Sequence, residues 1–147
     1  MLTTRIDTLP ELQNLEIISL WGNNITAIGE NVFQFYEAAD YLRMILDHNK
    51  LNESSFHPNS GISRAGRKTD LNLNYNYITT LPAPIFETFL DAHPSNILEL
   101  YGNPLICDER LSWIKSRRDE PEFQARVTFA NCDNDPGYTV FNSNLIP

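Results

Sequence analysis

The sequence predicts an α/β fold in which short parallel strands recur at a regular interval along the chain. Four copies of one pattern carry this prediction: two apolar residues two positions apart, an Asn three positions later, and an apolar residue two positions after the Asn. The copies span 18–25, 44–51, 71–78 and 98–105, with their Asn residues at Asn23, Asn49, Asn76 and Asn103. These Asn residues are 26, 27 and 27 positions apart. Four matches in register argue against chance spacing in an ordinary α/β domain.

A period in the twenties with this pattern is typical of the leucine-rich repeat, a solenoid whose coils cannot bury their apolar faces alone. The expected architecture is a right-handed β-α superhelix with a curved parallel sheet on its concave face. In each copy the apolar pair alternates as a strand does, so that Ile18 and Leu20 point inward while Trp21 points outward. The four Asn amides are predicted to form a ladder that satisfies backbone groups of the neighbouring coil. Phenylalanines of the convex side, Phe33, Phe56 and Phe86, are predicted to complete the core.

The repeats also divide the chain. Residues 1–103 form the repeat region: a partial first repeat in 1–14, full repeats at about 15–40, 41–67 and 68–94, and a last one at 95–103, before a C-terminal cap in 104–147. Lys68 and Ser95 stand where the third and fourth repeats expect an apolar first residue. Leu9 and Leu12 lead almost directly into the first strand, with no cysteine-rich N-terminal cap and no apolar signal segment. We therefore expect this chain to be an N-terminally incomplete fragment.

Composition limits the classes of function. The chain has 147 residues, a hydrophobic content of 41% and a net charge of −8. This balance supports one folded core and argues against nucleic-acid binding, which favours basic surfaces. No apolar run approaches the roughly 18 residues that a membrane span requires. No membrane insertion is expected within this chain.

Catalytic and cofactor signatures are not found in the sequence. The three His residues lack the spacing of metal ligands, and no phosphate-binding loop or nucleophile motif occurs. His48 beside Asp47 could suggest acid–base chemistry, but no nucleophile accompanies them, and we interpret His48 as a solvent-exposed contact residue. The sequence therefore predicts a protein without catalytic activity, metal or cofactor.

The segment 103–114 contains Asn-Pro-Leu-Ile-Cys-Asp-Glu followed by Leu111, Trp113 and Ile114. It resembles the opening of the cysteine-containing C-terminal cap of extracellular leucine-rich repeat proteins, such as Slit-like and Toll-like ectodomains. The resemblance implies that Asp108 caps a short helix at its N-terminus. It also implies that Leu111, Trp113 and Ile114 close the end of the solenoid.

Caps of this kind usually hold four cysteines, paired first to third and second to fourth. Cys107 matches the first and Cys132 the third, whereas Glu109 occupies the place of the second and no later Cys follows. The resemblance therefore implies a Cys107–Cys132 disulfide, and with it an oxidising, extracellular location. The alternative is a pair of buried thiols in a cytosolic protein.

Two glycosylation sequons agree with an extracellular location. They are Asn24-Ile25-Thr26 and Asn52-Glu53-Ser54, and both Asn residues follow a predicted strand. Sequons also arise by chance, so neither establishes glycosylation by itself.

Outward positions on the predicted strands form the expected contact surface for a protein partner. The candidate residues are Trp21, Arg43, Asp47, His48, Asn74, Tyr75, Glu99 and Tyr101. Trp21 and Tyr101 hold equivalent places in the first and last copies. Exposed aromatic residues beside mixed charge are typical of protein-binding patches. The alternative is an ordinary half-exposed sheet face whose aromatic residues only suit β-structure.

A narrower resemblance rests on the irregular repeats, on the Ile85–Glu87 turn and on the opening of the cap. These features are similar to an arthropod group related to the non-catalytic subunit of oplophorus-luciferin 2-monooxygenase, which implies a secreted protein that is not the catalyst. Two functions are therefore expected: a secreted or ectodomain protein-binding module, or an accessory subunit beside an enzyme's catalytic subunit. An intracellular repeat scaffold is a third possibility, which free thiols and unused sequons would support.

Overall fold

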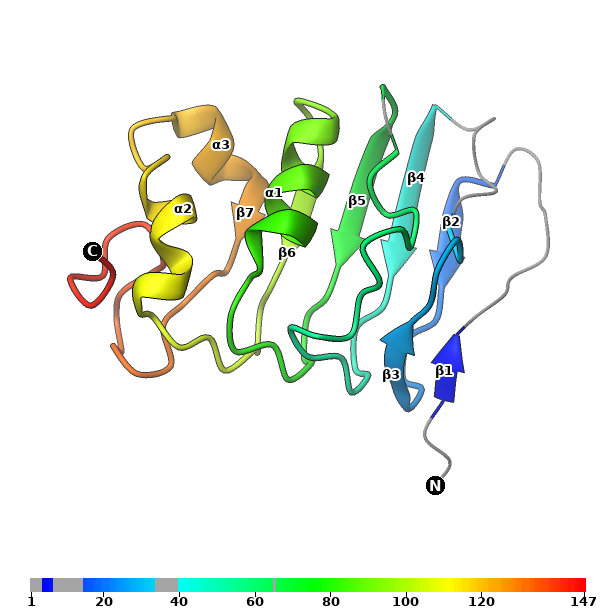
Figure 1. Cartoon of the computed structure of the whole chain (residues 1–147), viewed down its shortest axis with the longest axis horizontal. Coiled ribbons are helices and arrows are strands. Elements are labelled where there is room, and N and C mark those ends of the chain that lie inside the picture. The colour runs from blue at the N-terminus through cyan, green and yellow to red at the C-terminus, as the bar shows by residue number, and fades with distance from the viewer. Residues whose placement is uncertain (1–3, 7–14, 34–39, 65) are drawn as a thin grey trace.

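The computed structural model describes residues 4–6, 15–33, 40–64 and 66–147, which leaves the prediction for Leu9 and Leu12 outside the described residues. Within these residues the chain is α/β, with a few short helices and a five-stranded parallel sheet. Figure 1 shows the strands of this sheet side by side in chain order. They are β2 (Ile17–Ser19), β4 (Tyr41–Ile45), β5 (Lys68–Asn72), β6 (Ile97–Glu99) and β7 (Val127–Thr128). A separate parallel pair is formed by β1 (Thr4–Ile6) and β3 (Ile25–Ile28).

Equivalent positions of the four sequence copies lie opposite one another in the sheet. Ile18 pairs with Met44, Met44 with Leu71, and Leu71 with Leu98. The register continues beyond the fourth copy, because Val127 of β7 pairs with Leu98. All five side chains are buried, so this row of inward positions forms a continuous part of the core.

The inward position at the start of the later strands differs from the prediction. The pattern placed it at Lys68 and Ser95, which is wrong by one residue, because the buried side chains are those of Thr69 and Asn96. The Asn96 side-chain oxygen accepts a hydrogen bond from the Thr69 amide at 2.6 Å, and its Nδ2 donates to the Phe89 carbonyl at 2.8 Å. These two bonds satisfy the buried Asn96 side chain, so a polar residue is tolerated at this place in the core.

An asparagine ladder connects each copy to the one before it. The Asn49 Nδ2 donates to the Leu20 carbonyl at 2.9 Å, and its Oδ1 accepts from the Ile25 amide at 3.1 Å. The Asn76 and Asn103 amides repeat this arrangement towards the second and third copies. These three side chains are buried, so they satisfy backbone groups that water cannot reach.

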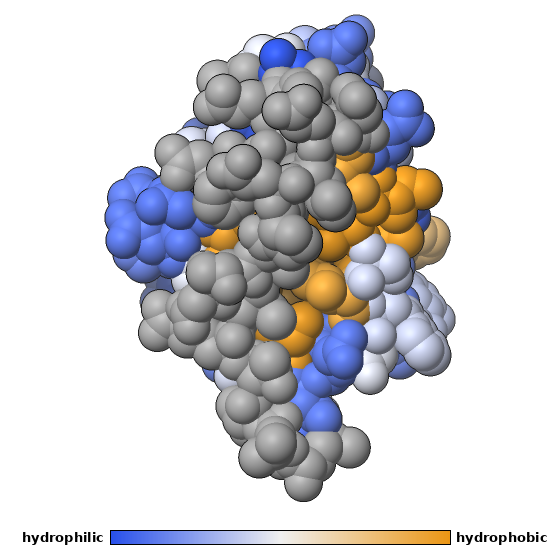
Figure 2. Space-filling view, turned by 90° about the vertical axis from the view of Figure 1, so that its right-hand side faces the viewer, coloured by the Kyte–Doolittle hydropathy of each residue, from blue (hydrophilic) through white to orange (hydrophobic). Residues whose placement is uncertain are grey.

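The β2 end of the sheet is different. Asn23 is exposed, and within the described part of the chain its Nδ2 donates only to its own turn, to the carbonyls of Leu20 and Trp21. Ile17 on the same strand is 55% exposed. Figure 2 looks at this end and shows hydrophobic side chains of the described chain between polar ones. The ladder therefore has a direction, in which the amides of Asn49, Asn76 and Asn103 each bond the preceding copy.

The side of the core away from the sheet is built from aromatic rings and one longer helix. Phe33, Phe56 and Phe86 are all buried as predicted, and the rings of Phe56 and Phe86 meet edge to face at 5.9 Å. Helix α1 (Ala83–Ala92) begins directly after Pro82 and carries Phe86 inward. Pro84, the second residue of the helix, suits its place because the fixed φ of proline fits the first helical turn.

The cap segment contains η1 (Glu109–Leu111), α2 (Ser112–Lys115) and α3 (Pro121–Arg126), of which α3 packs against β6 and β7. The expected N-cap at Asp108 is confirmed, since its side chain accepts from the Arg110 amide at 3.0 Å and η1 leads into α2. Leu111 and Ile114 are fully buried, and the Trp113 Nε1 donates to the Leu81 carbonyl at 2.8 Å.

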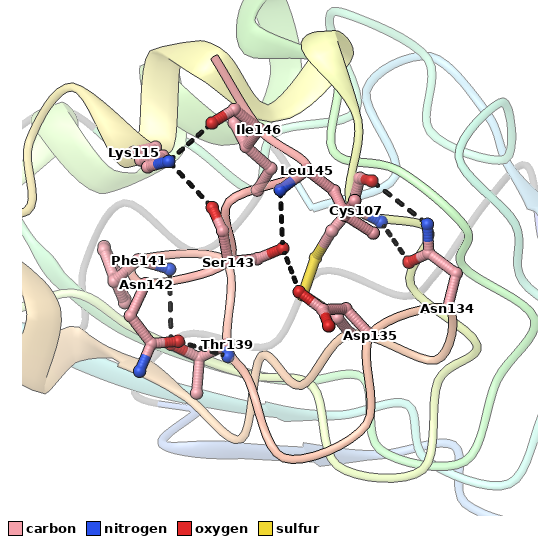
Figure 3. Close-up of a disulfide and its surroundings, with 11 residues drawn as sticks. Cys107, Lys115, Asn134, Asp135, Thr139, Phe141, Asn142, Ser143, Leu145 and Ile146 are labelled. Carbon is pink, nitrogen blue, oxygen red and sulfur yellow. Dashed lines mark hydrogen bonds between the residues drawn. A yellow bond between two sulfur atoms is a disulfide. The ribbon is translucent and has the colours of Figure 1, made fainter.

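The Cys107–Cys132 disulfide is present, with the two Cα atoms 5.4 Å apart. Figure 3 shows its surroundings, where the Asn134 side chain brackets Cys107. The Asn134 Oδ1 accepts from the Cys107 amide at 2.8 Å, and its Nδ2 donates to the Cys107 carbonyl at 3.1 Å. Lys115 in turn holds the C-terminal segment by donating to the carbonyls of Ser143 and Ile146. The cap is thus fixed by one covalent link and several buried polar contacts.

Candidate binding surface on the sheet

Five rings from five successive segments form one exposed row at the ends of the strands, which we call the aromatic stripe. It comprises Trp21, His48, Tyr75, Tyr101 and Phe129. Successive ring centroids are 5.7, 4.5, 5.2 and 5.4 Å apart. Trp21 and Phe129 are 59% and 61% exposed, and both tyrosines are 45% exposed. The structure therefore brings four of the predicted partner-binding residues together.

The first and fourth copies supply their rings two positions before the ladder Asn. Trp21 is followed by Gly22 and Tyr101 by Gly102, both with left-handed backbones at φ 68° and 76°. Glycine suits this turn because it has no Cβ to clash in the left-handed region. The equivalent places of Trp21 and Tyr101, expected from the sequence, thus correspond to equivalent backbone geometry.

The second and third copies supply their rings one position later, from the turn residue itself. His48 and Tyr75 have φ values of 55° and 53°, in the region that the other two copies fill with glycine. A side chain in this conformation costs about 1 kcal/mol or more. Non-glycine residues in this region are uncommon, and two of them lie next to each other in the stripe. Each copy therefore contributes one ring, either from two positions before its ladder Asn or from the position directly before it.

Phe129 extends the row and was missed by the sequence analysis. Counted along the register of β7, it aligns with the buried Leu100, so alternation places it inside the core. Its backbone is left-handed, at φ 57°, and its side chain is exposed, whereas the following Ala130 is buried. The left-handed backbone of this one residue therefore turns its side chain outward instead of inward, and no sequence motif predicts this conformation.

Asp47 and Asn74 support the stripe. The Asp47 Oδ2 lies 3.0 Å from the His48 Nδ1, and the Asn74 Oδ1 accepts from the Tyr101 amide at 2.8 Å. Desolvation first, and then the neighbouring Tyr101 side chain, raise the pKa of Tyr75.

The other two candidates, Arg43 and Glu99, lie in an ionic network across the middle of the sheet. The Arg43 guanidinium is 3.5 Å from Glu99 and 4.0 Å from Asp70, and Lys68 is 3.9 Å from Asp70. The Tyr41 hydroxyl donates to Asp70 at 2.8 Å, and burial, followed by this bond, raises the pKa of Tyr41. These charges are mutually paired, so they are less available to a partner than the stripe is.

A shallow pocket of about 260 Å³ lies at the Phe129 end of the stripe, and we call it the stripe pocket. Its lining comprises Tyr75, Tyr101, Gly102, Asn103, Phe129, Asn131, Cys132 and Asp133. A Cβ built on Gly102 would lie 2.6 Å from the Tyr75 Cδ1. Glycine at this position therefore lets the Tyr75 ring lie close to the backbone of the next copy.

The two sequons differ in their surroundings. Asn52 is exposed, and its Oδ1 accepts from the Ser54 amide at 2.8 Å, whereas Asn24 is half-buried. Asn52 is thus the more accessible acceptor for a glycan.

Among the residues that the structure describes, no group of three His, Cys, Asp or Glu side chains could hold a metal ion. None of the described helices has the length and apolar character needed to cross a membrane. The chain matches no protein-family model and no curated protein. The fold and the surface together define an α/β protein with an exposed aromatic row on a parallel sheet.

Proposed function

We propose that this protein is a non-catalytic leucine-rich repeat module that binds a protein partner through its concave strand face, with the aromatic stripe as the main contact. The repeat assignment draws on the 26- and 27-residue spacing, on the chain-order parallel strands and on the backward-reaching Asn amides. These features are those expected when short units stack and bury a shared core.

The observation that carries the binding function is the aromatic stripe. Exposed Trp and Tyr side chains are the residues that most often dominate protein interfaces, because they bury large areas at low cost in conformational entropy. The left-handed backbones of His48 and Tyr75 add weight, since a fold selected only for stability would keep glycine there. Mutual ring contacts hold the stripe in place before binding.

A secreted or ectodomain setting is part of the proposal. The Cys107–Cys132 disulfide is compatible with an extracellular location, where such bonds persist. The exposed Asn52 sequon agrees with the same compartment. Intact mass of the protein from its native source, with and without reduction, tests this part. Freely alkylated cysteines and an unglycosylated chain would instead indicate an intracellular scaffold.

The binding test compares two double variants with matched loss of exposed apolar area. Trp21→Ala with Tyr101→Ala removes two stripe rings, and Tyr77→Ala with Leu145→Ala removes two exposed side chains outside the stripe. The partner is captured from the native extracellular fluid on the wild-type chain, identified, and then titrated by calorimetry. We expect the stripe variant to bind more weakly by more than about 1 kcal/mol, roughly fivefold in Kd, while its circular dichroism spectrum shows that the fold is retained. Unchanged affinity would move the site to the convex side or to the cap.

A second variant separates binding from stability. His48→Gly removes one stripe ring and relieves a left-handed backbone, so the two effects on folding nearly cancel, within about 1 kcal/mol. Partner affinity should nevertheless fall. A variant that unfolds more easily yet binds normally would show that His48 serves the fold instead of the partner.

The identity of the partner then distinguishes two forms of the proposal. Co-purification with a secreted enzyme at fixed stoichiometry would make this chain an accessory subunit. A receptor or matrix ligand would make it an independent recognition module.

A further inference from the structure

The stripe pocket combines aromatic walls with one carboxylate. Tyr75 and Tyr101 meet at 88°, and Tyr101 and Phe129 at 73°, so each neighbouring pair of rings is packed edge to face. Asp133 alone is charged among the described residues that line the pocket. Its side chain is exposed, and no ion pair within the described part of the chain holds it.

We infer that this pocket takes a cationic side chain, arginine or lysine, from a basic segment of the protein partner. The inference rests on the proposed function and specifies the chemistry of the partner at one end of the stripe. A cation within about 6 Å of a ring centroid is attracted by the negative π-face, and several rings around one cation add to the effect. A carboxylate at the rim supplies the charge-assisted hydrogen bond that fixes the orientation of the cation.

Two properties favour a basic protein segment over other ligands. Successive rings along the stripe are tilted by 58°, 31°, 88° and 73°, so they form an uneven row and not the flat platform on which a sugar ring stacks. The chain carries a net charge of −8, which attracts basic partners and speeds their association.

The backbone positions both parts of the pocket. Gly102 leaves room for the Tyr75 ring, because any Cβ there would overlap its Cδ1 and Cε1 atoms at 2.6 and 2.8 Å. The Asp133 amide donates to the Leu105 carbonyl at 2.7 Å, directly after the disulfide-linked Cys132. The carboxylate is therefore anchored through its own backbone beside the rings.

Four capped octapeptides on one Gly-Ser frame serve as probes, carrying two arginines, two citrullines, two glutamates or two leucines. Citrulline keeps the shape of arginine and removes its charge. The full chain, isotopically labelled, is titrated with each peptide while the NMR signals of the Tyr101 and Phe129 rings and of the Gly102 amide are followed. We expect the arginine peptide to shift these signals saturably and the citrulline peptide to bind about tenfold more weakly. The glutamate peptide should leave them unmoved.

Matched variants test the two parts of the pocket. Asp133→Asn removes the carboxylate, and Asp119→Asn makes the same change of net charge on an exposed residue outside the pocket. We expect a roughly fivefold loss of affinity for the first and little change for the second. Gly102→Ala keeps every pocket side chain but displaces the Tyr75 ring. This variant should bind the arginine peptide more weakly, while the NMR signals of Trp21 stay in place.

Three results would overturn the inference. They are equal binding of the arginine and citrulline peptides, equal effects of the two Asp variants, and shifts confined to residues outside the stripe pocket. A leucine peptide that binds the stripe better than the arginine peptide would refute the cationic ligand yet leave the proposed protein-binding function standing. Failure of the native partner to respond to the stripe double variant would instead remove the proposed function itself.

Discussion

The same sequence pattern occurs at both ends of the parallel sheet, but its Asn residue makes different hydrogen bonds at each end and is expected to contribute differently to stability. At the cap end, Asn103 is buried and its amide serves the Leu73 carbonyl and the Ile78 amide of the preceding copy. At the β2 end, Asn23 is exposed and bonds only its own turn within the described residues. The contribution of a ladder Asn to stability therefore depends on whether its amide bonds backbone groups of the preceding copy, and not on the pattern alone.

The cap end also carries the covalent link, and removing it should have the largest effect. Counted along the register, Cys132 takes the place of a fifth ladder Asn, since Val127 pairs with Leu98. The bond closes a separation of 25 residues, for which loop-closure entropy predicts about 3 kcal/mol. We expect the Cys107→Ala, Cys132→Ala variant to lose about this much in urea unfolding. Reducing agent should lower the wild-type midpoint and leave the variant unchanged; a loss near zero would show that packing alone holds the cap.

The second effect compares the ladder residues directly. Asn103→Ala removes the side-chain partner of the buried Ile78 amide and of the Leu73 carbonyl, which should cost about 2 kcal/mol. Asn23→Ala removes bonds to an exposed turn and should change stability by no more than about 0.5 kcal/mol. Chemical denaturation of both variants measures the difference. Equal losses would contradict the backward direction of the ladder.

The third effect concerns how the cap helix is attached. Trp113→Phe keeps an aromatic ring against the core but loses the hydrogen bond from Nε1 to the Leu81 carbonyl. We expect a loss of about 1 kcal/mol in the free energy of unfolding. Trp21→Phe at the opposite end is the matched control, because its indole is exposed and donates no hydrogen bond to any of the described residues. If Trp21→Phe lost more free energy of unfolding than Trp113→Phe, the cap end would not be the more strongly stabilised end.

The smallest effect depends on pH. The side-chain hydrogen bond from Arg110 lowers the pKa of Asp108 beyond the opposing effect of desolvation. Because the folded pKa is below the unfolded one, the stabilisation is complete above about pH 4 and is lost as the pH falls through the folded value. Asp108→Asn should therefore be less stable than wild type by about 0.5 kcal/mol near neutral pH. The gap should close in acid; a gap independent of pH would rule out the charged pair as its cause.

Much of the sheet could be predicted because its inward positions follow a strict period. The apolar pairs and the three buried ladder Asn residues occupy their expected places, as does the cap disulfide implied by resemblance. The first inward positions of β5 and β6 could not be placed, since they hold the polar residues Thr69 and Asn96, of which Asn96 is held by specific hydrogen bonds inside the core. A hydrophobic pattern does not predict such hydrogen bonds.

The stripe could be predicted in part for a related reason. Trp21 and Tyr101 stand at an outward position of the strand period, whereas Phe129 depends on a left-handed backbone that reverses alternation. Arg43 and Glu99 were expected to serve a partner, yet they lie in an ionic network with Asp70. Periodicity identifies which face a residue occupies, but it does not identify which neighbours neutralise it.

The backward direction of the Asn amides has a consequence for how the chain emerges from the ribosome. The backbone amides of Ile25, Leu51 and Ile78 donate to Asn49, Asn76 and Asn103. Each of these amides therefore gains its acceptor only when the next copy has been translated. Because N-terminal parts fold first during synthesis, the growing end always exposes one unfinished turn. At Cys132, which takes the place of a ladder Asn, a covalent bond to Cys107 replaces this dependence on hydrogen bonds.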